Sequence, residues 1–326
     1  LYSLYHTILN FVALKCMTQG PHMETINGYK LIKEFTNENA GFCRWAYAKK
    51  DGHVYFIKQF MSPKFPLDNA KLSEKAKSAR LKVCEDFVAR KQRLYSAMRQ
   101  IRTGNIVVVE EFFREGSSFY ITTDFVPKED NLDISQISKM PGDKKILLIR
   151  TILYSIMKMH EQNIVHADIK PTNILIKKTS AGYYTGKIID FDASYFEDDI
   201  PEEILGDQVY LAPEARLRME DGTTELTCKV DIFALGILFH QYWCGELPQI
   251  DSNYGSVFEA VLDDGRVVLD ESIPTKISSI ISKMLSKNSA DRPSAKDLLS
   301  SFADLEAGCQ TASAAQKGFY IPKGIG

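Results

Sequence analysis

The sequence predicts an α+β protein with two lobes: a small strand-rich lobe that contains one long helix, followed by a larger, mainly helical lobe. Three observations support this prediction. Residues 28–60 and 106–126 alternate apolar and polar side chains in short runs, which is typical of half-buried strands. A long proline-free segment lies between these two regions. After Pro127 the apolar residues recur at helical spacing instead.

Turn signals and composition place the elements of the small lobe. Asp51-Gly52 separates two alternating runs and Glu115-Gly116 separates another two, so each pair is expected to form a hairpin. The segment from Asp68 to Ile101 is rich in Lys, Arg, Ala and Leu, which favour a helix. We therefore expect one long helix between two hairpins.

Helical periodicity dominates the rest of the chain. Within residues 144–162, Ile146, Ile149, Leu153 and Ile156 fall on one helical face. Short strands are expected next, at Ile164-Val165, Ile174–Ile176 and Lys187–Ile189. Four further helices are expected, over Asp231–Trp243, Tyr254–Leu262, Thr275–Leu285 and Ser294–Phe302.

The change of pattern after residue 126 sets the predicted domain boundary. We predict an N-terminal lobe over residues 23–126, a C-terminal lobe over residues 127–307 and a tail over residues 308–326. Residues 1–22 are expected to be an N-terminal extension or a segment left by cloning. The reason is that Gly20-Pro21-His22-Met23 resembles a vector-derived junction before a start methionine.

Composition limits the possible functions. The 326 residues are 44% hydrophobic and 25% charged, and 40 Lys and Arg against 42 Asp and Glu give a formal net charge of −2. This composition is typical of a folded chain, and the lack of basic excess argues against a nucleic-acid partner. No apolar run reaches the roughly 18 residues that a membrane span needs. The six cysteines include no C-x-x-C pair, which favours reduced thiols in a cytoplasmic protein over disulfides or a zinc site.

Six short motifs follow one another along the chain. They are Tyr55-Phe56-Ile57-Lys58, the run from His166 to Asn173 (HADIKPTN), Asp190-Phe191-Asp192, Ala212-Pro213-Glu214, Asp231-x-Phe233-x-x-Gly236 and Asp291-Arg292-Pro293. In this order and spacing the motifs resemble those of eukaryotic-like (Hanks-type) serine/threonine protein kinases, over about residues 30–305. The resemblance implies the bilobal protein-kinase fold.

The resemblance also implies an enzyme that uses ATP and Mg²⁺ to phosphorylate a hydroxyl group of a protein substrate. Such a transfer needs charge neutralisation and an in-line hydroxyl more than covalent help. Asp168 would accept the proton of the hydroxyl, Lys170 would face the transferring phosphate, and Lys58 would hold the α- and β-phosphates. Asn173 and Asp190 would supply the oxygen ligands that Mg²⁺ prefers.

Contacts to the rest of the nucleotide follow from the same resemblance. Asp124 and Val126 fall on the segment whose backbone groups would bind adenine. Leu175 falls at the position beneath the adenine ring. Gly41 is the glycine that remains in the expected phosphate-binding loop.

The expected partner of Lys58 is a glutamate of the long helix. Glu85 is favoured because it is closer in sequence to the second hairpin, and Phe87 and Leu94 would provide a packing face. Glu74 is an alternative partner. A third possibility is that Lys58 pairs with no glutamate of this helix.

Three departures from the family pattern concern the nucleotide. The phosphate loop keeps one glycine, Gly41, where three would let the backbone approach phosphate closely. Phe56 replaces a small alanine and, with Trp45, crowds the expected adenine site. Asp192 replaces the glycine of the D-F-G motif. Because the catalytic and metal-binding side chains are all present, we favour an active kinase. A pseudokinase that acts as a binding or scaffold module is the main alternative, and a small-molecule kinase is another.

Overall fold

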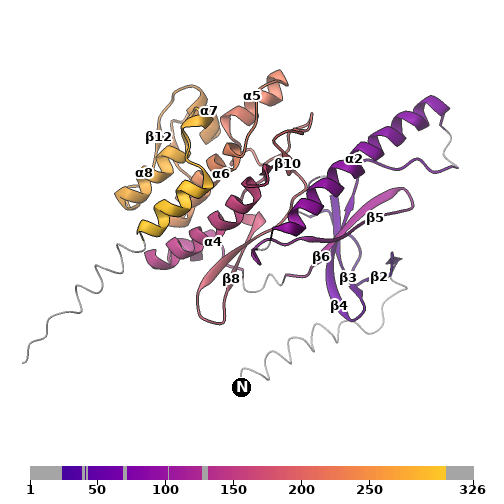
Figure 1. Ribbon diagram of the computed structural model, residues 1–326. Coiled ribbons are helices and arrows are strands. Elements are labelled where there is room, and N and C mark those ends of the chain that lie inside the picture. The colour runs from indigo at the N-terminus through magenta and orange to yellow at the C-terminus, as the bar shows by residue number, and fades with distance from the viewer. Residues whose placement is uncertain are drawn as a thin grey trace, which may run out of the picture. The chain divides into compact units, whose positions relative to one another are not determined.

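The structure is a computed structural model that describes residues 24–38, 41, 43–68, 72–101, 103–126 and 131–305. The chain forms two compact units, which divide after Ser96, Val107 and Val126. Unit 1 contains a six-stranded sheet and most of one long helix, and unit 2 is mainly helical (Figure 1). The predicted α+β class is therefore confirmed.

Unit 1 is built on an antiparallel sheet in which the strands follow the order β1-β2-β3-β4-β6-β5. The strands are β1 (Thr25–Ile26), β2 (Tyr29–Leu31), β3 (Cys43–Lys50), β4 (His53–Phe60), β5 (Val109–Glu115) and β6 (Ser118–Asp124). Asp51 and Gly52 have φ values of 51° and 85°, as a two-residue hairpin turn requires. Both predicted hairpins, β3–β4 and β5–β6, are confirmed. Asn27-Gly28 forms a further turn between β1 and β2.

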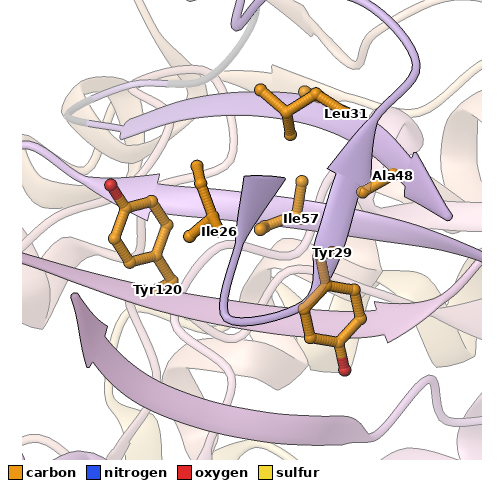
Figure 2. Packing of buried hydrophobic residues seen from close by; sticks show 7 residues of the cluster. Ile26, Tyr29, Leu31, Ala48, Ile57 and Tyr120 are labelled. Atoms are coloured by element: carbon orange, nitrogen blue, oxygen red, sulfur yellow. The ribbon is translucent and has the colours of Figure 1, made fainter. Parts of the chain in front are cut away.

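The two faces of this sheet carry different side chains, because successive residues of a strand point to opposite faces. One face carries a buried core cluster, shown in Figure 2, of Ile26, Tyr29, Leu31, Ala46, Ala48, Ile57 and Tyr120. Since Ile57 belongs to this cluster, Phe56, Lys58 and Phe60 of β4 lie on the opposite face.

The long helix α2 (Glu74–Gln100) packs on that opposite face. The ring centroid of Phe87 lies 5.1 Å from that of Phe60 and 5.3 Å from that of Phe119. The predicted long helix is confirmed, but it begins at Glu74 rather than at Asp68. The reason is that the Ser73 hydroxyl accepts a hydrogen bond from the Ala76 amide at 3.3 Å, which is the bonding of a helix cap.

Unit 2 is organised around α6 (Lys229–Cys244), which is buried almost all round and packs against α3 (Ile134–Ser138), α4 (Gly142–His160) and α8 (Thr275–Met284). The other helices are α5 (Pro213–Asp221), α7 (Val257–Leu262) and a helix over residues 295–305. The strand pairs are β7 (Ile164–Val165) with β10 (Tyr195–Phe196), β8 (Ile174–Lys178) with β9 (Tyr184–Ile188), and β11 (Gln249–Ile250) with β12 (Val267–Val268).

The predicted helices of unit 2 are present, and their starts depend on local caps. α7 begins at Val257 rather than at Tyr254, because Ser256 and Glu259 form a reciprocal capping box. α5 was not among the predicted helices, and it begins at Pro213, a residue suited to the first turn.

Candidate active site

The loop between β7 and β8 carries Asp168, Lys170 and Asn173. Asp231 of α6 holds this loop through hydrogen bonds to its backbone. The Asp231 carboxylate accepts hydrogen bonds from the backbone amides of His166 (2.8 Å) and Ala167 (2.9 Å). His160, at the end of α4, lies 3.0 Å from the same carboxylate. Burial by itself raises the pKa of Asp231, but the contacts with His160 and His166 outweigh it and hold the pKa below its ordinary value. Asp231 therefore acts as an anionic anchor for the loop.

The carboxylate of Asp168 is fixed by three donors. The Asn173 side-chain amide donates to Asp168 Oδ2 at 2.8 Å, and Lys170 Nζ lies 3.0 Å from the same oxygen. The backbone amide of Asp207 donates to Asp168 Oδ1 at 3.2 Å. The structure therefore brings three predicted site residues together, and it adds Asp207, which the motifs did not identify.

A backbone hydrogen bond brings Asn173 and Asp190 close together. The Ile189 amide donates to the Asn173 carbonyl at 3.0 Å, which places the next residue, Asp190, beside the loop. Asp190 has φ of 64° and Ala167 has φ of 65°. Non-glycine residues with positive φ cost about 1–3 kcal/mol each and cluster at functional sites. Two of the described non-glycine residues with positive φ are therefore the predicted metal ligand Asp190 and the neighbour of Asp168, while others, such as Asp51, lie in turns.

The Asp190-Phe191-Asp192 segment packs on the same loop. The Phe191 ring lies 5.3 Å from the His166 ring, and His166 Nε2 lies 3.1 Å from the Ile189 carbonyl. Asp192, which is within the described residues, is not among those with positive φ. The replacement of the motif's glycine by Asp192 therefore imposes no left-handed strain.

In unit 1, Lys58 lies on the α2-covered face of β4 and is only 4% exposed. An aromatic cluster of Trp45, Tyr47, Phe56 and Phe125 shares this face. Trp45 stacks on Phe56 with ring centroids 5.4 Å apart and planes inclined by 25°. The Trp45 indole also donates a hydrogen bond to the Glu38 carbonyl at 2.8 Å, which fixes its orientation. Trp45 and Phe56, the two bulky side chains that the sequence predicted to crowd the adenine site, therefore stack on each other.

The glutamate expected to pair with Lys58 is exposed. All three acidic residues of α2, Glu74, Glu85 and Asp86, are exposed. One charged α2 side chain beside β4 is Lys91, whose Nζ lies 5.8 Å from the Phe60 ring centroid. Phe60 and Lys58 share one strand face, so Lys91 lies on the Lys58 side of the sheet. The pairing of Lys58 with Glu85 stays a prediction.

The remaining predicted nucleotide contacts belong partly to unit 1 and partly to unit 2. Gly41 is exposed, with φ of 53°, in the turn before β3. Asp124 is exposed at the end of β6, and Val126, two residues later, is half-buried. Leu175 of β8 is buried.

Two further searches of the described residues bear on metals and membranes. Among them, no group of three or more His, Cys, Asp or Glu side chains is arranged to hold a metal ion, so a cysteine–histidine zinc site is not found there. No described helix is both long and apolar enough to cross a bilayer. Cys84, Cys228 and Cys244 are free thiols, Cys43 is buried in β3, and Cys16 and Cys309 lie outside the described residues.

Comparison with known proteins bears directly on the motifs. The family described as "Protein kinase domain" matches residues 70–302, a range that includes the Asp168 loop but not Lys58 or Gly41. The chain is 28% identical over 278 residues to "Calcium-dependent protein kinase 4" of Plasmodium falciparum (isolate 3D7), covering 83% of this chain and 48% of that protein.

Two other relatives show the same pattern. "Calcium-dependent protein kinase 27" of Arabidopsis thaliana is 24% identical over 296 residues, 87% of this chain and 56% of that protein. "Serine/threonine-protein kinase CG17528" of Drosophila melanogaster is 26% identical over 169 residues, 51% of this chain and 22% of that protein. The chain thus spans about half the length of the calcium-dependent kinases it matches. Because the family match covers most of the chain, in the expected motif order, the chain belongs to the protein kinase family.

Proposed function

We propose that this protein kinase is catalytically active and transfers the γ-phosphoryl group of ATP to serine and threonine hydroxyls of protein substrates, with Mg²⁺. The observation that carries the proposal is the Asp168 carboxylate, which Lys170, Asn173 and the Asp207 amide hold at 2.8–3.2 Å. A general base must be positioned before it can act, and phosphoryl transfer depends chiefly on position and charge.

The proposed roles of the loop residues follow from their chemistry. The substrate oxygen forms a bond to the γ-phosphorus while the bond from that phosphorus to the β,γ-bridging oxygen breaks. The substrate's proton passes to Asp168, and ADP leaves with the bonding electron pair. Lys170 carries the positive charge that neutralises the transferring phosphoryl group.

Asn173 and Asp190 suit a magnesium ion. Mg²⁺ is usually held in such sites by one or two protein oxygens together with water and phosphate oxygens. The Asn173 side-chain nitrogen is used in hydrogen bonds to Asp168, which leaves the side-chain oxygen as a ligand. When bound, the ion would neutralise phosphate charge.

The nucleotide contacts are assigned by position in the motifs. We assign Lys58 to the α- and β-phosphates, Gly41 to the loop over the phosphates, and the backbone of Asp124 and Val126 to the adenine edge. Leu175 supplies an apolar contact to the ring. The Lys in the Asp168 loop and the serine/threonine kinases named among the relatives support hydroxyl specificity for Ser and Thr.

The second candidate function is that of a pseudokinase that binds nucleotide weakly, and one observation favours it. The aromatic cluster occupies the Lys58 face of the sheet, where a small residue is expected beside the nucleotide base. In that case the chain would act as a binding or scaffold module.

One experiment separates the two functions. The purified chain is incubated with γ-labelled ATP, Mg²⁺ and the general acceptors casein and histone, and labelled residues are identified by phosphoamino-acid analysis. We expect phosphoserine and phosphothreonine from the wild type, none from Asp168→Ala, and an unchanged rate from Asp143→Ala, an exposed carboxylate of α4. Thermal stabilisation by ATP with no transfer to any acceptor would instead support the pseudokinase.

A further inference from the structure

Gly206 and Asp207 lie directly against the Asp168 loop. A Cβ atom built on Gly206 would meet the Ala167 carbonyl at 3.0 Å, so only a residue without a side chain fits here comfortably. The next residue, Asp207, donates its backbone amide to Asp168 Oδ1 at 3.2 Å. The segment before Ala212-Pro213-Glu214 is thus attached to the catalytic loop by a close backbone approach and a hydrogen bond.

The Asp207 side chain makes a second attachment, to Lys170. Lys170 Nζ lies 3.0 Å from Asp168 Oδ2 and 3.8 Å from Asp207 Oδ2, so one ammonium group serves two carboxylates. The other oxygen of Asp207 accepts a hydrogen bond from the Val209 amide at 3.0 Å, which fixes the carboxylate within its own segment. The three side chains together carry a net charge of −1.

The far side of this segment is fastened to α6. The Tyr210 hydroxyl donates to the Gln241 side chain at 2.6 Å, and Leu211 and Ala212 are buried. Asp207 therefore stands between a segment held by α6 and the two side chains proposed to act on the phosphoryl group.

We propose that Asp207 is a positioning residue: by sharing Lys170 with Asp168 it holds the ammonium between the two carboxylates. Without it, Lys170 pairs with Asp168 alone, and the ammonium lies less favourably for the transferring phosphoryl group. This inference rests on the proposed function and extends it to a residue outside the six motifs. A charge shared in this way acts on the chemical step more than on substrate binding.

The test compares Asp207→Asn, which keeps the backbone amide but removes the charge, with Glu203→Gln, an equal charge change at an exposed position of the same segment. We expect Asp207→Asn to lower kcat about tenfold or more with KM for ATP and acceptor within about twofold. Glu203→Gln should leave both constants unchanged, and Asp207→Glu should restore part of kcat.

A second readout does not require activity. Labelling of Lys170 by an amine-reactive reagent is measured by mass spectrometry against Lys178, an exposed lysine of β8. Because the shared ion pair protects the amine, labelling of Lys170 should rise in Asp207→Asn and not in Glu203→Gln. Unchanged labelling, or an active Asp207→Asn enzyme with wild-type kcat, would overturn the proposal. An inactive wild type with raised labelling in Asp207→Asn would refute the proposed function while leaving the hold of Asp207 on Lys170 established.

Discussion

The Arg292 guanidinium donates to both carboxylate oxygens of Glu214, at 2.6 and 2.8 Å, across a sequence separation of 78 residues. Arg292 is 1% exposed and also donates to the carbonyls of Ser286 and Lys229 at 2.9 Å. Its guanidinium carbon lies 4.9 Å from the Phe233 ring centroid. This bidentate pair joins the start of α5 to the segment after α8.

Removal of Glu214 should strongly destabilise the protein. Glu214→Ala leaves a buried guanidinium without its counter-charge, and breaking such a pair costs about 3–5 kcal/mol. Urea unfolding followed by circular dichroism measures the change. The matched control is Glu220→Ala, because Glu220 forms an exposed pair with Arg216 at 2.8 Å, worth about 0–1 kcal/mol. If both variants lost the same free energy of unfolding, burial would not be what makes the Glu214–Arg292 pair important for stability.

Replacement of Lys58 or Asp190 should abolish phosphoryl transfer. We expect Lys58→Met and Asp190→Asn each to lower the rate about 100-fold or more, because each removes a charge that the reaction needs. Circular dichroism and a thermal melt should show a folded protein. Lys49→Met, at an exposed position on β3, is the control and should keep the wild-type rate. A variant at position 58 or 190 with most of the wild-type rate would show the role to be wrongly assigned.

Truncation of Phe56 should tighten nucleotide binding. Its ring stacks on Trp45 on the Lys58 face, so Phe56→Ala opens the space expected for the base. We expect about tenfold stronger binding of a fluorescent ATP analogue, one decade being about 1.4 kcal/mol. The variant should lose less than the roughly 3–5 kcal/mol typical of a fully buried aromatic, since Phe56 is half-buried.

The control for this variant is Phe113→Ala, which removes a ring that packs against the core cluster on the opposite face. It should change stability without changing nucleotide affinity. If Phe56→Ala binds the analogue no better than the wild type, crowding by this ring is not what limits binding.

Protonation of His240 should destabilise the protein in mild acid. His240 Nδ1 donates to the Glu246 carbonyl (2.8 Å) and Nε2 accepts from the Asp270 amide (3.0 Å). Protonation of Nε2 removes the bond from the Asp270 amide, whereas the bond from Nδ1 survives it. Burial lowers the pKa of His240 below the ordinary 6.5, against the opposing effects of the Glu246 carbonyl and Asp270. The unfolded chain therefore binds the proton more readily than the folded chain.

The sign follows from this difference. The contribution of His240 is fully present above about pH 6.5 and is lost as the pH falls below it, with a slope of at most about 1.4 kcal/mol per pH unit. Urea unfolding from pH 8 to pH 5 measures the loss, and a His240→Gln variant should have a flatter profile. His53→Gln, which changes an exposed histidine, should keep the wild-type slope. Parallel profiles for wild type and His240→Gln would refute the prediction.

Local signals in the sequence determined much of the fold. Asp51-Gly52 specifies its turn because both residues tolerate positive φ, and the alternation on either side then specifies two paired strands. The order of the six motifs likewise predicted the protein kinase family. Each turn and each motif is recognised from residues close together in the chain, and the order of the motifs is read directly along the sequence, so no knowledge of distant contacts is needed.

The start of α2 and the face it turns to the sheet depended on more than composition. A helix rich in Lys and Arg can place either Glu85 or Lys91 toward a partner, because its apolar residues do not form a single clear stripe. Packing of Phe87 on Phe60 and Phe119 decides the rotation, and it leaves Glu85 exposed.

The placement of Asp207 beside Asp168 and Lys170 was decided by tertiary structure alone. In sequence it is one of several acidic residues between Asp190 and Ala212, and nothing local distinguishes it. It differs from the others because Gly206 allows the backbone to approach Ala167 closely, and this approach brings Asp207 to Asp168 and Lys170. Long-range contacts of this kind depend on how distant segments pack, which short sequence patterns do not encode.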